Sequence, residues 1–155
     1  VTSTGDVLAA DKSTRAINRF SAAGKYQAQF APVHALRLAI DSTDRVAALE
    51  EDGGGIAVLD ADGRTVTRIH PRGQGYQFDR SVDVAFDAFG HVYVLDRNVG
   101  AVHVFTSQQP PKLVTSFSIP NRAPGNFRRA RAFGLDGAGR LYIYDDDVEK
   151  ILVYQ

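Results

Sequence analysis

Several absences limit what this chain of 155 residues can do. It contains no cysteine, so it has no disulfide framework, no thiol nucleophile and no thiolate metal site. Its 18 Lys and Arg residues are balanced by 18 Asp and Glu residues, so no excess positive charge favours nucleic acid or an anionic membrane. No apolar run approaches the roughly 18 residues of a membrane span. What remains is an ordinary globular composition, 44% hydrophobic and 23% charged.

The chain also has no methionine and no signal-peptide pattern, and it begins with Val1. We therefore expect it to be a mature or excised piece of a longer protein. The absence of cysteine fits an oxidising compartment, although it does not identify one.

One pattern runs through the sequence four times in a single register. Each unit opens with an acid or a threonine, and a second acid follows nine residues later. The opening residues, spaced 39, 46 and 49 apart, are Thr2, Asp41, Asp87 and Asp136. The second acids are Asp11, Glu50, Asp96 and Asp145. Self-similarity at this spacing indicates a repeat architecture.

Apolar runs within each unit predict four short strands, called a to d in chain order. Strand a alternates, as in Val82, Val84 and Phe86, whereas strand b is apolar throughout, as in 92–95. A continuous apolar run predicts burial on both faces of a sheet. Strand b ends in the second acid, which begins a hairpin turn, and strands c and d follow. Four antiparallel strands per roughly 45 residues, each sheet lying between two neighbours, are typical of a β-propeller blade.

The sequence therefore predicts an all-β propeller segment with about 14 strands, or about three and a half blades. The expected blade units are 1–35, 36–81, 82–130 and 131–155. The first unit supplies little of strand a, and the fourth supplies no strand d.

The third unit carries the residues of a known repeat. It contains the glycine-rich stretch 73–78, the turn from Asp87 to Gly90, the strand 92–95 before Asp96, and the strand 102–105. These residues resemble the NHL repeat, and the stretch from 124 to 154 resembles it equally well. The usual Asn-x-Arg before strand c is absent from all four units. The resemblance covers nearly the whole chain and implies a ring, typically six-bladed, of roughly 270 residues.

The resemblance also implies a range of functions. NHL proteins include RNA-binding tripartite-motif proteins, extracytoplasmic sensor domains of bacterial kinases and a metal-dependent amidating lyase. The commonest role implied is a non-catalytic scaffold for a protein or a ligand. Two alternatives stay open: part of a lyase-like or lactonase-like propeller enzyme with its catalytic residues outside this chain, and an RNA-binding NHL domain. With the absence of cysteine, the resemblance favours a periplasmic or secreted location.

The expected partners are another protein or the remaining blades, rather than nucleic acid, and no cofactor is expected. The histidines at 34, 70, 91 and 103 hold four different repeat positions. A metal site on the axis needs ligands from equivalent positions of several blades, so no metal site is predicted. No glycine-flanked nucleophile with a paired histidine occurs either, so no catalytic residue is predicted.

Arginines gather in the connections from strand d to strand a. The candidate binding residues there are Arg72, Arg80, Arg128, Arg129 and Arg131. Up-and-down topology places them on the same rim as the acidic hairpins at 50–52 and 145–147. They either form ion pairs between neighbouring turns, each worth about 0–1 kcal/mol, or make a patch for phosphate, nucleic acid or an acidic partner.

Two further candidates begin strand a in adjacent units, close to the expected axis. Arg37 and Asp83 either pair with each other or line the central channel of a complete ring. In both cases their charges face inward from neighbouring blades.

The segment interpretation makes a prediction about the end blades. We expect Leu8, Ile17, Leu152 and Tyr154 to require apolar partners that this chain does not supply. The isolated segment should therefore aggregate or form oligomers, which sedimentation would detect. A soluble monomer that unfolds cooperatively would contradict this interpretation and favour a self-contained four-bladed ring.

Overall fold

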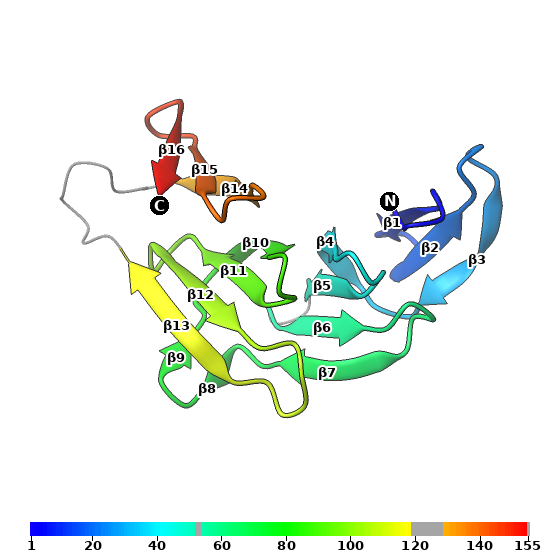
Figure 1. The fold of residues 1–155 in the computed structure, drawn as a ribbon, viewed down its shortest axis with the longest axis horizontal. Helices are drawn as coiled ribbons and strands as arrows, with labels where there is room; N and C mark the ends of the chain where they lie inside the picture. Colours follow the sequence, from blue (N-terminus) through cyan, green and yellow to red (C-terminus); the bar gives the residue numbers. More distant parts are fainter. Residues whose placement is uncertain (52–53, 119–128, 155) are drawn as a thin grey trace.

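A computed structural model describes residues 1–51, 54–118 and 129–154, which form four larger sheets and one small hairpin (Figure 1). The first sheet contains β1 (Val7–Asp11), β2 (Ala16–Phe20) and β3 (Tyr26–Ala31). The second contains β4 (Ala35–Ile40), β5 (Val46–Glu50), β6 (Ile56–Leu59) and β7 (Thr65–Ile69). The third contains β10 (Ser81–Phe86), β11 (Val92–Asp96), β12 (Ala101–Phe105) and β13 (Leu113–Ser118). The fourth contains β14 (Ala130–Leu135), β15 (Leu141–Asp145) and β16 (Lys150–Tyr154).

These four sheets, called blades 1 to 4, are antiparallel and pair their strands in sequence order. Figure 1 shows them following one another along an open arc, with β4, β10 and β14 on its inner side and β3, β7 and β13 outside. Strand β10 contacts both β4 and β14, so the inner strands of successive blades lie side by side. The prediction of an all-β fold with strands a to d is confirmed, and strand b corresponds to β1, β5, β11 and β15. No helix that could cross a membrane occurs in the described residues.

The small hairpin of β8 (Arg72–Gly73) and β9 (Tyr76–Gln77) was not predicted. Two-residue strands are too short to show a hydrophobic period. The hairpin turns through Gly75, whose φ of 83° favours glycine. A Cβ at Gly73 would overlap the Tyr76 ring, so glycine at this position leaves room for the ring to lie against the backbone.

Apolar side chains fill the interface between each pair of blades. Val46, Ala48 and Leu59 of blade 2 pack with Ile17 of blade 1, and the opposite face of blade 2 packs against blade 3. Alternate residues of β5 therefore pack in the interfaces with blade 1 and with blade 3, and this explains why strand b is apolar at every position. The predicted burial of Val94, Leu95 and Ile143 is confirmed, since all three are 0% exposed.

The expectation for the end blades was wrong about which residues face outward. Ile17 is fully buried against blade 2, and Leu8 packs against the same cluster. Leu152 and Tyr154 likewise pack toward blade 3. Neighbouring residues point to opposite faces of a strand. The exposed apolar side chains on the strands of the end blades are Val7, Tyr26, Tyr144, Ile151 and Val153.

In units two to four, the opening acid stabilises the turn that precedes strand b. One carboxylate oxygen of Asp87 accepts hydrogen bonds from the backbone N–H groups of Phe89, at 2.9 Å, and His91, at 2.8 Å. Asp41 and Asp136 accept the equivalent pair of bonds in their own turns. Bonds from the backbone and side chain of Arg140 lower the pKa of Asp136 to about 2. The first repeated acid is therefore a structural residue of the turn.

The second repeated acid joins two segments of the same blade. Asp96 is fully buried, and its Oδ1 accepts N–H bonds from Asn98, at 3.1 Å, and Val99, at 3.2 Å, in the hairpin after β11. Its two oxygens also accept bonds from Asp79, at 2.6 Å, and Arg80, at 3.1 Å, just before β10. Asp145 makes the corresponding bonds in blade 4. The carboxylate thus fixes the entry of strand a against the end of strand b.

The packing of blade 4 predicts the effect of removing a buried side chain. Ile143→Ala should lower the free energy of unfolding by about 2–5 kcal/mol, because it leaves a cavity at the interface with blade 3. Ile151→Ala, at an exposed position of the same sheet, should change it by about 0.5 kcal/mol or less. Denaturant titration of both variants tests this, and a loss under about 1 kcal/mol for Ile143→Ala would contradict the assigned packing.

The bonds of Asp96 predict a second loss of stability. In Asp96→Asn an amide group replaces one acceptor oxygen, so at least one buried N–H group loses its partner. We expect unfolding to become easier by about 2–4 kcal/mol. Asp62→Asn, in an exposed turn of blade 2, is the matched control and should be close to neutral. Equal effects in the two variants would show that the buried carboxylate has no special role.

Candidate functional site

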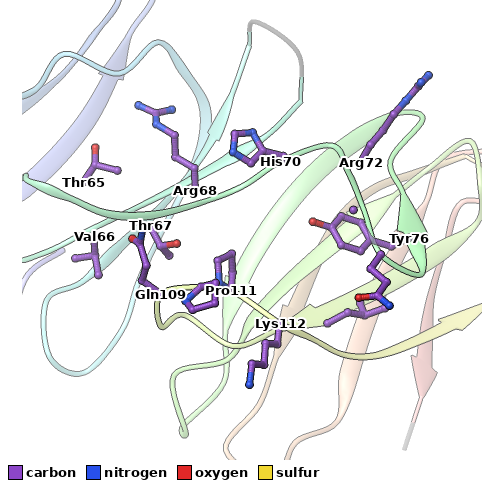
Figure 2. A pocket seen from close by; sticks show the side chains of 14 residues that line it. Thr65, Val66, Thr67, Arg68, His70, Arg72, Tyr76, Gln109, Pro111 and Lys112 are labelled. Carbon is purple, nitrogen blue, oxygen red and sulfur yellow. The ribbon is translucent and has the colours of Figure 1, made fainter.

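A groove of about 950 Å³ lies between blades 2 and 3 (Figure 2). Strand β7 and the β8–β9 hairpin form one side, and the turn at 109–113, between β12 and β13, forms the other. Its lining residues are Thr65, Val66, Thr67, Arg68, His70, Arg72, Gly73, Gln74, Tyr76, Gln109, Pro110, Pro111, Lys112 and Leu113. The long turn between β12 and β13 therefore becomes a wall of the groove.

The ionisable groove residues that carry nitrogen are Arg68, His70, Arg72 and Lys112. The lining contains no aspartate or glutamate. Figure 2 shows Arg68 and Arg72 extending to one side of β7 and Lys112 to the other. Glu50 contacts the Arg68 guanidinium from outside the lining, whereas Arg72 and Lys112 are exposed. The arrangement favours a ligand that carries negative charge along its length.

Tyr76 connects the groove to the core. Its ring lies 4.7 Å from the Phe105 ring and 5.4 Å from the Phe78 ring, measured between centroids. Burial raises the pKa of Tyr76 and lowers the pKa of His103, which belongs to the same aromatic cluster. The expectation that Phe78 belongs to the core is confirmed, and the equivalent Phe127 lies outside the described residues. The groove therefore has a rigid aromatic base.

The predicted arginine patch divides between two places. Arg72 lines the groove, whereas Arg129 and Arg131 lie at the rim of blade 4. There the Asp146 carboxylate lies 3.6 Å from the Arg129 guanidinium and 2.6 Å from that of Arg131. These ion pairs form within one blade rather than between neighbouring turns, because Asp145 holds the two segments together. Arg128 lies outside the described residues.

The rim contains a further arginine that the sequence analysis missed. Arg97 follows β11, and its backbone N–H donates to the Arg80 carbonyl at 2.9 Å. Burial lowers the pKa of Arg97, and the charges of Arg80, Arg131 and Arg129 lower it further. Comparing the residue after strand b in each unit would have identified it, because that position holds Lys12, Glu51, Arg97 and Asp146.

Asp83, the third residue of β10 rather than the first as predicted, connects two blades. One oxygen accepts the Phe133 N–H of β14 at 3.0 Å, and the other accepts the Val84 N–H at 3.0 Å. Burial raises the pKa of Asp83, while these bonds and the charge of Arg37 act in the opposite direction. Arg37 itself donates to the Leu36 carbonyl at 2.9 Å. The two residues are close enough to interact electrostatically, but Asp83 uses its oxygens for backbone groups.

The histidines occupy separate environments. His34 lies 2.7 Å from Glu51, His91 lies 2.8 Å from Asp87, His103 contacts Ser116, and His70 lines the groove. In the described ranges, no three His, Asp or Glu side chains are grouped so that they could hold a metal ion.

The chain was compared with known proteins. No protein-family model matches it, and no curated protein does. Among solved structures, virginiamycin B lyase from Staphylococcus aureus, crystallised in an inactive form with quinupristin, has a TM-score of 0.68 at 14% identity. That match covers 100% of this chain and 53% of the lyase. The WD40 repeats of RRP9 match with a TM-score of 0.60 at 17% identity, over 99% of this chain and 49% of that one.

The fold is a β-propeller. The described blades and both solved structures agree on this architecture. The chain spans about half the length of each of these propellers. One of them is a lyase and the other a set of WD40 repeats, and both are under 20% identical to this chain. The likeness therefore establishes the fold and leaves the function to be argued from this chain's own surface.

Proposed function

We propose that this propeller segment is a non-catalytic, NHL-like scaffold that binds an acidic segment of a partner protein in the groove between blades 2 and 3. The observation that carries the proposal is the charge of the lining, which holds four basic side chains and no acid. An acidic segment would gain favourable electrostatic interactions along the groove, and opposite charge would also speed association.

The shape of the groove supports an extended ligand. Its lining follows β7 from Thr65 to Arg68 and continues through His70 to Arg72, so the groove is elongated. Strand β7 is the last strand of its sheet, and its outer edge therefore lies free of the sheet's own ladder. A free strand edge is a common place for an added peptide strand. Five extended residues would span about 17 Å beside it.

The chemistry of the lining supports binding rather than catalysis. His70 is the one histidine of the lining, and the lining supplies no carboxylate to orient it as an acid or a base. Threonine hydroxyls, glutamine amides and basic side chains suit recognition of carboxylates and of peptide backbone. A propeller enzyme with catalytic residues outside this chain remains the alternative, and an RNA-binding propeller is the third.

Binding of a labelled peptide tests the proposal. A peptide of alternating Glu and Ser should bind the purified protein that contains this chain, and a Gln and Ser peptide should bind much more weakly. Arg72→Glu combined with Lys112→Glu should raise the Kd of the acidic peptide at least about tenfold, which is about 1.4 kcal/mol. Both positions are exposed, so the melting temperature should stay nearly constant.

The matched control is Arg64→Glu combined with Lys25→Glu, which makes the same change of charge in exposed turns outside the groove. It should leave peptide binding unchanged. An equal loss of peptide binding in both double variants would show that binding depends on net charge alone, and this would contradict a specific groove. Chemical conversion of the bound peptide into a product would overturn the non-catalytic assignment. Tighter binding of single-stranded RNA than of the acidic peptide would favour the RNA-binding alternative.

A further inference from the structure

The blades share a backbone contact that brings two side chains together at the rim. The residue after strand b donates its N–H to the carbonyl of the residue just before strand a. This bond joins Glu51 to His34 at 2.9 Å, Arg97 to Arg80 at 2.9 Å, and Asp146 to Arg129 at 3.2 Å. The repeat therefore builds one pair of neighbouring side chains in each of blades 2, 3 and 4.

Blade 3 differs from its neighbours in the charge of this pair. In blade 2 the pair combines an acid with a histidine, and Glu51 lies 2.7 Å from His34. In blade 4 it combines an acid with an arginine, and Asp146 lies 3.6 Å from Arg129. In blade 3 both positions carry arginine. The backbone bond joins the main chains of these two arginines, and the charge of Arg80 lowers the pKa of Arg97. The two like charges therefore repel each other in this blade.

Blade 4 adds to the positive charge beside this pair. Strands β11 and β14 are in contact, so the rims of blades 3 and 4 adjoin. The pKa of Arg97 is lowered by burial and by the charges of Arg80, Arg131 and Arg129, whereas the charge of Asp146 acts in the opposite direction. Asp146 is already shared by Arg129 and Arg131. The rim arginine cluster is defined as Arg80, Arg97, Arg129 and Arg131, and within the described residues Asp146 is the acid that it shares between two of its members.

Two of the three acids on the other side of Arg80 already have cationic partners. Arg80 lines a small cavity of about 370 Å³ with Glu50, Glu51 and Asp79. Glu50 contacts Arg68, and Glu51 lies 2.9 Å from Lys12. These contacts reduce the negative charge that could neutralise the cluster.

We propose that the rim arginine cluster binds a doubly charged oxyanion of the phosphate-monoester class, with Arg97 and Arg80 as its principal ligands. Guanidinium groups donate paired hydrogen bonds that match phosphate oxygens, and a dianion would relieve the repulsion within the pair. Nucleic acid fits less well, because single strands usually stack on exposed aromatic rings. Among the residues that the structure describes, the most exposed aromatic side chain is that of Phe89, which lies in the turn between β10 and β11, at the opposite end of β11 from Arg97.

Thermal unfolding with inorganic phosphate as the probe tests this site. The purified protein that contains this chain is compared in sodium phosphate and in sodium chloride of equal ionic strength, at a pH of about 8, where phosphate is a dianion. We expect phosphate to raise the melting temperature in a saturable way, and chloride to do so much less. Arg97→Gln should unfold at a higher temperature than wild type in chloride, because the repulsion is removed, and should lose the phosphate-dependent increase.

Three further variants make the result specific. Arg97→Lys keeps the charge but loses the paired donors, so it should bind phosphate at least about tenfold more weakly by titration calorimetry. Arg80→Gln should also lose the effect, and it replaces Arg97→Gln if that variant does not fold. Arg64→Gln, in an exposed turn of blade 2, should keep the full phosphate effect. The groove variant with Arg72→Glu and Lys112→Glu should keep it too, and this separates the site from the proposed peptide groove.

Several results would overturn the proposal. A phosphate effect that survives in both Arg97→Gln and Arg80→Gln would place the anion elsewhere. If chloride raised the melting temperature as much as phosphate, the phosphate effect would be general ionic screening. Tighter binding of a single-stranded oligonucleotide than of O-phosphoserine would assign the arginines to nucleic acid instead.

Discussion

The buried carboxylate at the end of strand b is the interaction on which the rest of this structure depends. Asp96 bonds simultaneously to the hairpin that leaves its strand and to the segment that enters strand a. Asp145 repeats this arrangement in blade 4. Because one side chain satisfies donors from two segments, it fixes the rim of each blade, and the side chains of that rim are positioned as a consequence.

Apolar packing between blades places the groove. Blades 2 and 3 share a core that includes Val58, Val94 and Phe105, and Tyr76 extends this core to the surface. The β8–β9 hairpin and the long turn at 109–113 then form the sides of the groove. The groove is thus built where insertions in the repeat meet, and its base is as rigid as the interface beneath it.

The net charge of the molecule is zero, but its charged side chains are unevenly distributed. Many of its carboxylates cap turns or contact a neighbouring cation, as Asp41 does with Arg45 and Glu51 with Lys12. Within the described residues, basic side chains are grouped in the groove and in the rim arginine cluster. A zero net charge therefore conceals two separate cationic surfaces. They account for two binding proposals with different ligands.

The sequence by itself determined the blades, because strand periodicity and the repeated acids are local signals. It predicted the buried strand b, including Val94 and Ile143, and it placed the acids in turns. Tertiary structure decided which residues meet. Only the packing of whole sheets turned Ile17 toward blade 2, separated Arg72 from Arg129 and Arg131, and brought Arg97 beside Arg80. The physical reason is that a strand pattern fixes alternation but not which face is covered, and that side-chain neighbours from different blades depend on how the blades pack.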